Sequence, residues 1–213
     1  MRQSTAEIIR EYGPFPGAKN VGGVTHDGTS VWFAAGESLR RFDPETGAEQ
    51  EALAVPAHAG TAFDGECLYQ IADGLIQRID AATRRVVSTI PAPAGTGTSG
   101  LAWAEGTLWA ADYKGRKIHE IDPRSGVVLR TIESNRFVTG VTWVDGELWH
   151  ATWENEESDL RRVDPSTGEV VERLELPEGV KISGLESDGK DRFYCGGGGS
   201  GMVRAVRRPE KAR

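Results

Sequence analysis

Two loops of this chain hold residue types that could bind a ligand or exchange protons. The first runs from Trp153 to Glu157 and sets an aromatic ring beside Glu154, Asn155 and further carboxylates. An aromatic face can hold a cation or a sugar ring, and a positioned carboxylate can act as a general acid or base. We therefore predict Trp153 and Asn155 as ligand-binding residues and Glu154 as a catalytic residue. The alternative is a solvated acidic loop with one tryptophan folded over its sheet.

The second loop carries Asp112, Tyr113 and Lys114 in succession. We predict Asp112 as a second catalytic residue, because it could exchange protons, and Tyr113 and Lys114 as ligand-binding residues. Arg136, in the stretch SNRFVTG, is predicted to bind an anionic group of the ligand. The alternative for Arg136 is an ordinary surface arginine.

Cys195 and His150 occupy the same position in two neighbouring repeats, and both are predicted to lie beside the ligand. A cysteine and a histidine can act together as nucleophile and base. Equivalent positions in neighbouring repeats point the same way round a ring, however, so a buried cysteine that behaves as a small hydrophobe is the alternative. The run CGGGGSG, which begins at Cys195, either lets a ligand approach the backbone closely or forms a flexible turn.

No metal site and no cofactor are predicted. The spacings Cys-x-x-Cys and His-x-x-x-His, which are typical of zinc sites, do not occur. The four histidines lie in different local contexts: His26, His58, His119 and His150. Carboxylates and carbonyls at one end of the fold could hold Ca²⁺ or Mg²⁺, but their spacing does not support such a site.

A unit that recurs five times must position these residues. Each copy begins with a glycine, continues as a short apolar strand and an Asp-Gly or Glu-Gly turn, and ends in a strand with an aromatic residue. The copies begin at Gly23, Gly60, Gly100, Gly140 and Gly184, with spacings of 37, 40, 40 and 44 residues. Periods of this length are typical of solenoids and propellers.

The second half of each unit distinguishes between these architectures. In four copies an apolar strand ends in an aspartate and is followed by a turn and another strand: Asp43, Asp80, Asp122 and Asp164. Three of the turns read Asp-Pro-x-Thr/Ser-Gly, in which glycine supplies the positive φ, while Arg84 replaces this glycine in the second copy. Each unit therefore reads as four short antiparallel strands, and the chain as an all-β, five-bladed β-propeller.

The two ends of the chain predict how the ring closes. The fifth unit stops after three strands, whereas the N-terminal segment TAEIIREYGPFPG reads like the outer strand of another unit. We predict that this N-terminal strand closes the last blade, because an open sheet edge invites aggregation. Residues 1–213 then form a single propeller domain, with blades at about 22–58, 59–97, 98–138, 139–182 and 183–209 plus 5–17.

Residues that recur in every unit are expected to be structural, whereas residues that appear in one unit are candidates for function. An aromatic residue that recurs in every unit is expected in the core: Trp32, Tyr69, Trp109, Trp149 and Tyr194. Function is expected at one mouth of the channel, where the loops that precede the innermost strands meet the loops that join the second and third strands. The preceding loops hold Lys19, Asn20, His58, Thr96, Thr98, Asn135, Arg136 and Lys181.

Composition narrows the class of partner. The net charge of −7 argues against nucleic acid, which requires a basic surface, and no apolar run is long enough to span a membrane. The N-terminus lacks the apolar segment of a secretory signal, and two cysteines do not make a disulfide framework. We therefore expect a cytoplasmic protein whose partner is a small molecule or a short peptide.

The stretch WVDGELWHATW, followed by LRRVDPSTGEVVERLEL, resembles the fourth blade of plant and bacterial glutamine cyclotransferases. The order of strands and turns extends this resemblance over most of the chain. Members of that family are five-bladed propellers that convert N-terminal glutamine to pyroglutamate. The resemblance implies the same fold, and it places Trp153 on a tryptophan that lines the family's substrate pocket.

Several positions depart from that family. Its Phe-Thr-Gln-Gly-Leu segment is replaced by residues 20–24, and its Glu-Ser-Thr-Gly segment, with the acidic residue expected to shuttle protons, has no counterpart in FAAGESL. Three functions therefore stay open. The protein could bind a small molecule or short peptide at the channel mouth, act as a cyclotransferase-like or lyase-type enzyme, or serve as a non-catalytic protein-interaction propeller.

Overall fold

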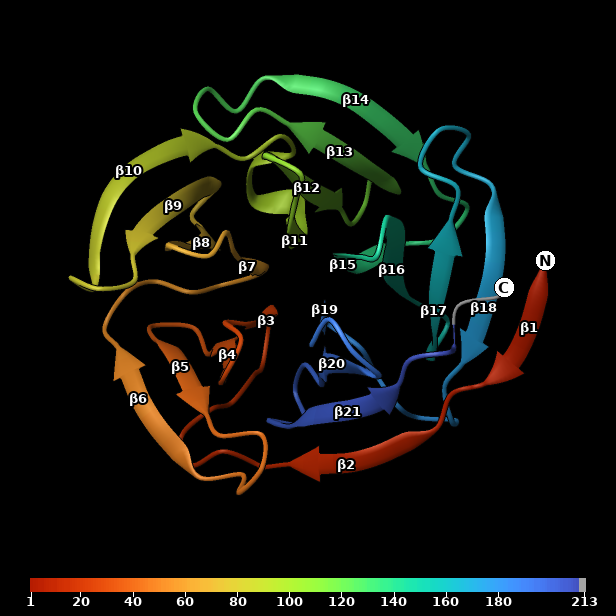
Figure 1. Ribbon diagram of the computed structural model, residues 1–213, viewed down its shortest axis with the longest axis horizontal. Helices are drawn as coiled ribbons and strands as arrows, with labels where there is room; N and C mark the ends of the chain where they lie inside the picture. Colours follow the sequence, from red (N-terminus) through yellow and green to blue (C-terminus); the bar gives the residue numbers. More distant parts are fainter. Residues whose placement is uncertain (211–213) are drawn as a thin grey trace.

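Five sheets arranged round a common axis form the protein. The computed structural model describes residues 1–210, and Figure 1 shows the sheets as the blades of a β-propeller. Within these residues the elements are strands and one 3-10 helix, η1 (Gly95–Gly97). The predicted all-β, five-bladed propeller is confirmed.

In each blade, four antiparallel strands lie side by side, ordered from the innermost at the axis to the outermost at the rim. Blade 1 contains β3 (Val24–His26), β4 (Val31–Ala34), β5 (Leu39–Phe42) and β6 (Glu49–Leu53). Blade 2 contains β7 (Thr61–Phe63), β8 (Cys67–Ala72), β9 (Leu75–Asp80) and β10 (Arg85–Pro91). Blade 3 contains β11 (Thr98–Ala104), β12 (Thr107–Asp112), β13 (Lys117–Ile121) and β14 (Val128–Glu133). Blade 4 contains β15 (Val138–Val144), β16 (Glu147–Glu154), β17 (Glu157–Val163) and β18 (Val170–Glu175). Blade 5 contains β19 (Gly184–Ser187), β20 (Arg192–Gly196), β21 (Val203–Arg207) and β2 (Ile8–Tyr12).

The N-terminal strand closes the ring, as predicted. β2 pairs antiparallel with β21 and becomes the outermost strand of blade 5 (Figure 1). Two buried aromatic residues then pack against blade 1: Tyr12 lies 4.6 Å from Phe42 and Phe15 lies 4.4 Å from Phe33, measured between ring centroids. The sequence did not predict β1 (Arg2–Thr5), which pairs in parallel with β18 at the rim of blade 4.

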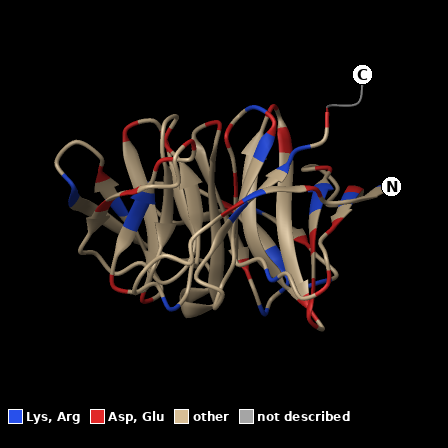
Figure 2. Cartoon of the chain, turned by 90° about the horizontal axis from the view of Figure 1, so that it is seen from below, with Lys and Arg blue, Asp and Glu red and all other residues tan. Residues whose placement is uncertain are grey.

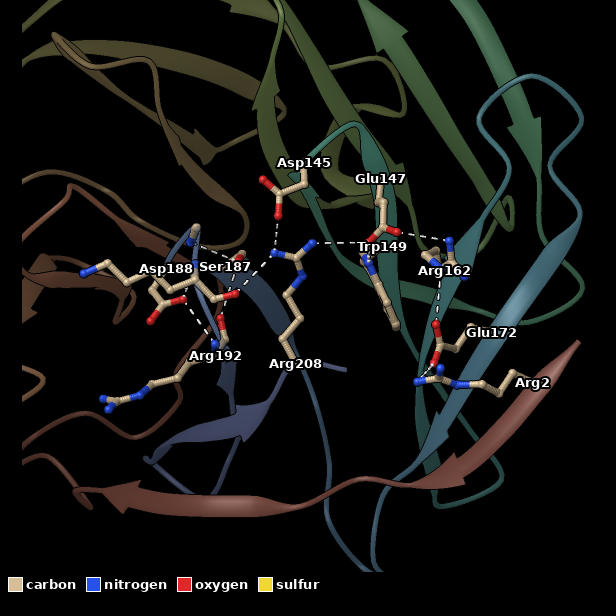
Figure 3. A network of polar contacts seen from close by, with 12 residues as sticks. Arg2, Asp145, Glu147, Trp149, Arg162, Glu172, Ser187, Asp188, Arg192 and Arg208 are labelled. Atoms are coloured by element: carbon tan, nitrogen blue, oxygen red, sulfur yellow. Dashed lines mark hydrogen bonds and ion pairs between the residues drawn. The ribbon is translucent and has the colours of Figure 1, made fainter. Parts of the chain in front are cut away.

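A series of ion pairs ties the C-terminal segment to blade 4 and β1 (Figure 3). Arg208 contacts Glu147 at 3.3 Å, and Arg162 contacts both Glu147 at 3.0 Å and Glu172 at 3.2 Å. Glu172 also pairs with Arg2 at 2.7 Å. Because the side chains of Arg208, Glu147 and Glu172 are largely buried, each needs its partner to offset the loss of hydration.

The repeated aspartates serve as turn residues. In three blades the aspartate Oδ1 accepts hydrogen bonds from backbone N–H groups two and three residues further on: Asp43, Asp122 and Asp164. The following glycines have positive φ, and Arg84 takes a φ of 61° at the same place in blade 2. The local sequence therefore determines where these hairpins turn.

The recurring aromatic residues form the core between the blades. At most 3% of their surface is exposed: Trp32, Tyr69, Trp109, Trp149 and Tyr194. Aromatic residues of the innermost strands stack on them across the blade interfaces, with 5.6 Å between the Trp103 and Tyr69 centroids and 5.9 Å between those of Trp143 and Trp109. These contacts account for the recurrence of both positions.

The five glycines that begin the repeats form a ring around the axis. A Cβ atom on Gly23 would lie 2.5 Å from Gly60 Cα, and one on Gly100 would lie 2.7 Å from Gly140 Cα. A Cβ atom on Gly184 would lie 2.8 Å from Gly23 Cα, which completes the circle. The innermost strands therefore meet backbone to backbone at this level, where no side chain fits.

One carboxyl group lies among the innermost strands of blades 4, 5 and 1. Glu186 accepts hydrogen bonds from Thr25 Oγ1 at 2.8 Å, from Thr142 Oγ1 at 2.5 Å and from the Ser187 backbone N–H at 2.8 Å. A part of Glu186 remains accessible to solvent, but its carboxyl group is surrounded by protein. Burial raises the pKa of Glu186 to about 7, and the three hydrogen bonds act in the opposite direction.

Candidate functional site

The loops at one mouth of the channel enclose a cavity of about 430 Å³. Blades 3 and 4 contribute residues from near the junction of their second and third strands: Tyr113 and Lys114 in the loop after β12, and Trp153 near the end of β16. All five blades also contribute residues from the loops that precede the innermost strands or from the first residues of those strands: Asn20, Gly22, His58, Ala59, Thr96, Gly97, Thr98, Ser99, Thr139, Lys181, Ile182 and Ser183. These are the two sets of loops that the repeat pattern brings to one face.

Aromatic and cationic side chains line this mouth together. Lys181 Nζ lies 3.6 Å from the centroid of the Trp153 ring, a cation–π contact. Tyr113 packs against Phe137 with 4.9 Å between ring centroids, and the Arg116 guanidinium lies 4.6 Å from the Phe137 centroid. Both aromatic residues of the lining are therefore held by neighbouring side chains.

His58 brings a titratable group to the lining. Its Nδ1 lies 3.4 Å from Asp73 Oδ1, and its Nε2 lies 3.9 Å from Glu37 Oε1. Both carboxylates are exposed and can orient the imidazole ring. Because an imidazole ring can accept a proton at one nitrogen and donate one from the other, His58 is the lining residue best suited to general acid–base chemistry.

A buried hydroxyl group also lines the cavity. Thr139 is 6% exposed, and its Oγ1 has no hydrogen-bond partner among residues 1–210. An unpaired buried hydroxyl is costly, and a polar ligand atom in the cavity could satisfy it. The cavity thus offers cations, aromatic faces and an unused hydrogen-bonding group.

Three of the predicted site residues meet in this cavity, namely Trp153, Tyr113 and Lys114. Glu154 follows Trp153 on β16, and successive side chains of a strand point to opposite faces. Its carboxylate pairs with Arg116. Arg136 Nη2 donates to the Glu154 carbonyl oxygen at 2.9 Å. Glu154 and Arg136 therefore stabilise the blade 4 loop, and neither of them lines the cavity.

Two further predicted residues lie where a second strand turns into a third: Asp112 at the end of β12, and Asn155 in the turn after β16. Asp112 Oδ1 accepts a hydrogen bond from the Gly115 backbone N–H at 2.9 Å, which stabilises the turn after β12. Asn155 is exposed, has a φ of 54° and lines a separate groove with Glu156 and Glu157. Neither Asp112 nor Asn155 belongs to the lining of the mouth cavity.

His150 and Cys195 lie inside the blades instead of at the mouth. Burial raises the pKa of the Cys195 thiol to about 12, so it stays protonated near neutral pH. Burial and the nearby Arg161 lower the pKa of His150 to about 4. His150 lines a cavity against blade 3, whereas Cys195 packs in an apolar cluster with blade 4 residues such as Leu160. His150 lies between blades 3 and 4, and Cys195 lies between blades 4 and 5. This separation is expected for equivalent positions in neighbouring blades.

The glycine run packs against blade 1. Gly198 exchanges two backbone hydrogen bonds with Val21, at 2.9 and 3.0 Å. A Cβ atom on Gly196 would collide with the Gly22 carbonyl oxygen. The close backbone approach that these glycines permit therefore joins blade 5 to blade 1.

Lys181 and His58 lie in loops predicted to reach the mouth, but neither they nor Thr139 were among the predicted binding residues. The repeat itself contains a pattern that identifies this region. The residue before each repeat glycine lines the cavity in every blade: Gly22, Ala59, Ser99, Thr139 and Ser183.

Charged residues are spread over both ends of the ring. Figure 2 shows aspartates and glutamates in the loops of both faces. Among residues 1–210, no group of three or more His, Cys, Asp or Glu side chains is placed to hold a metal ion. In the same part of the chain, no helix has the length and apolar character needed to cross a membrane.

Comparison with known proteins shows the fold of this chain. No protein-family model matches it, and no curated protein matches its sequence. Glutaminyl cyclase from Myxococcus xanthus has a similar structure, with a TM-score of 0.78 and 21% sequence identity over 97% of each chain. A chain of the mitotic checkpoint complex matches with a TM-score of 0.59 and 12% identity, over 95% of this chain and 92% of that one. The predicted resemblance to the glutamine cyclotransferase propellers is thus confirmed at the level of the fold.

Proposed function

We propose that this protein binds a small molecule or short peptide with a carboxylate group at the channel mouth. The composition of the cavity lining carries this proposal. Lys114 and Lys181 belong to the lining, whereas no aspartate or glutamate of residues 1–210 does. Lysine ammonium groups form charge-assisted hydrogen bonds with carboxylates, so this cavity favours an anionic ligand.

The other lining residues suit the rest of such a ligand. Trp153 and Tyr113 offer faces for an apolar or planar group, and Thr139 Oγ1 offers a hydrogen bond. Lys181 can bind the carboxylate while it remains over the Trp153 ring. The cavity volume of about 430 Å³ falls within the range of small-molecule sites, roughly 300 to 1,000 Å³.

A matched pair of ligands tests the proposal: N-acetylphenylalanine and its C-terminal amide, followed by calorimetry and thermal unfolding. The acid at about 100 times its Kd should add roughly 2.7 kcal/mol of stability, and the amide should bind more weakly. Lys181→Met and Trp153→Leu should weaken binding of the acid. Lys190→Met is the control, because Lys190 lies in the turn between β19 and β20, outside the cavity lining. Equal binding of acid and amide would contradict the proposal.

Acid–base catalysis of the cyclotransferase or lyase type is the second candidate function. The fold likeness to a glutaminyl cyclase and the presence of His58 in the lining support it. We would incubate the protein with a peptide that begins with glutamine and measure ammonia release and the peptide mass. Catalysis at this site requires that His58→Ala abolish the reaction while binding of N-acetylphenylalanine persists. If no tested small molecule binds, a protein-interaction role becomes the better explanation.

A further inference from the structure

A second cavity, of about 390 Å³, lies between blades 3 and 4. It shares no lining residue with the mouth cavity. Its walls are mainly apolar: Ile118, Ile132, Val163 and Val170. Glu133 and Asn135 are exposed at its opening, and His150 is 1% exposed at its inner end. The cavity therefore leads from a polar rim past apolar walls to one buried polar side chain.

Comparison with another blade interface explains why space is left here. Between blades 5 and 1, four aromatic residues pack together: Tyr12, Phe15, Phe33 and Phe42. The residues at the same places between blades 3 and 4 are smaller or polar: Ile132, Asn135, His150 and Val163. In the filled interface, the Phe15 ring lies 4.4 Å from that of Phe33 and 5.1 Å from that of Phe42. Because protein interiors are close-packed, four smaller side chains at these places leave a cavity.

The buried histidine lacks a partner on one side. His150 Nδ1 has no hydrogen-bond partner among residues 1–210. Burial and Arg161 hold the pKa of His150 at about 4, so the ring is neutral near pH 7. Arg161 Nη1 donates to Asn135 Oδ1 at 2.6 Å, which leaves the Asn135 amino group as the remaining donor of that side chain. Buried polar atoms in proteins are almost always paired, so the His150 imidazole has hydrogen-bonding capacity that residues 1–210 leave unused.

We infer that the cavity between blades 3 and 4 binds a small apolar molecule that carries one hydroxyl group. The hydrocarbon part would fill the space that aromatic side chains occupy between blades 5 and 1. The hydroxyl group would pair with the His150 imidazole, and it serves either tautomer because a hydroxyl can both donate and accept. A dry cavity of about 150 Å³ holds benzene, so the larger volume here suits a substituted phenol.

Two probes of the same shape test this inference: 4-ethylphenol and ethylbenzene, which lacks the hydroxyl group. Nitrogen-15 NMR of the histidine side chains should show a shift of a His150 ring-nitrogen signal with 4-ethylphenol. This probe should bind about tenfold more tightly than ethylbenzene, the ratio expected for one hydrogen bond to a buried partner. Val163→Phe, which places a phenylalanine where blade 1 has Phe42, should abolish binding. Trp153→Leu should leave it unchanged, which separates this site from the mouth cavity.

An unchanged His150 signal with 4-ethylphenol at its solubility limit would overturn the inference. Equal affinity for the two probes, or full binding by the Val163→Phe variant, would do the same. If that variant does not fold, His150→Phe serves instead, since blade 1 holds Phe33 at this position. Unchanged binding of 4-ethylphenol by His150→Phe would equally overturn the inference.

Discussion

Replacing Glu186 by glutamine tests the role of the carboxyl group among the innermost strands. The amide is neutral at every pH and nearly the same size as the carboxyl group. Its oxygen can still accept from Thr142 Oγ1 and the Ser187 N–H, and its NH₂ group can donate to the Thr25 hydroxyl. The substitution therefore removes the titration of this group while the hydrogen bonds around it can persist.

The magnitude follows from the pKa of Glu186, which is raised from an ordinary 4.5 to about 7. The native protein holds this proton more tightly than the unfolded chain does, so the neutral carboxyl stabilises the fold below about pH 4.5. That contribution is lost as the pH rises through about 7. At about 1.4 kcal/mol per pH unit of pKa difference, the loss reaches about 3 kcal/mol.

The assay is urea unfolding of the parent and Glu186→Gln at pH 5, 6, 7 and 8. We expect the variant to gain less than about 1 kcal/mol relative to the parent at pH 5, and its advantage to grow to about 3 kcal/mol by pH 8. Other titrating groups are common to both proteins, so they cancel in the difference. Glu178→Gln, in an exposed loop, is the control and should show no such trend. A difference that stays constant between pH 5 and 8 would refute the reasoning.

Two further predictions concern the ring itself. Gly100→Ala should lower the unfolding free energy by about 2 kcal/mol or more in urea denaturation, because the new Cβ would lie 2.7 Å from Gly140 Cα. In the control Gly199→Ala, the new Cβ would have no atom within 4 Å. An equal loss of unfolding free energy there would contradict the explanation that the repeat glycines are needed for backbone contact. Tyr12→Ala should cost about 3 to 5 kcal/mol in the same assay, because it empties a buried site on the closing strand. Ser4→Ala, on exposed β1, should cost less than about 0.5 kcal/mol, and equal costs would mean that β2 does not stabilise the ring.

The blade count and the closing strand could be predicted because they depend on local patterns. An Asp-Pro-x-Thr/Ser-Gly turn ends a strand through its own backbone geometry, and alternate residues of a strand share a face. The recurring aromatic core, including Trp149 and Tyr194, follows from the same periodicity. β1 escaped prediction because its residues, RQST, are polar and exposed and show no alternation of apolar side chains.

The candidate site could be predicted only in part. The repeat places Trp153, Tyr113 and Lys114 near the junctions of second and third strands at one mouth of the ring, and all three line the mouth cavity. The direction of each side chain could not be inferred, because Glu154 lies beside Trp153 in the sequence and pairs with Arg116. The contact of Lys181 with Trp153 joins the loop before β19 to the end of β16 in another blade, and no pattern within one repeat encodes it.

The sequence by itself determined the repeating strands and turns, the number of blades and the strand that closes the ring. Only the tertiary structure decided which side chains of different blades meet. Glu186 and Thr25 lie far apart in the chain but bond at 2.8 Å, and the cavity beside His150 exists because blades 3 and 4 lack the aromatic residues that fill the interface of blades 5 and 1. The physical reason is that strand and turn hydrogen bonds depend on neighbouring residues. Contacts between blades depend on the rotation and spacing of the closed ring, which no single repeat specifies.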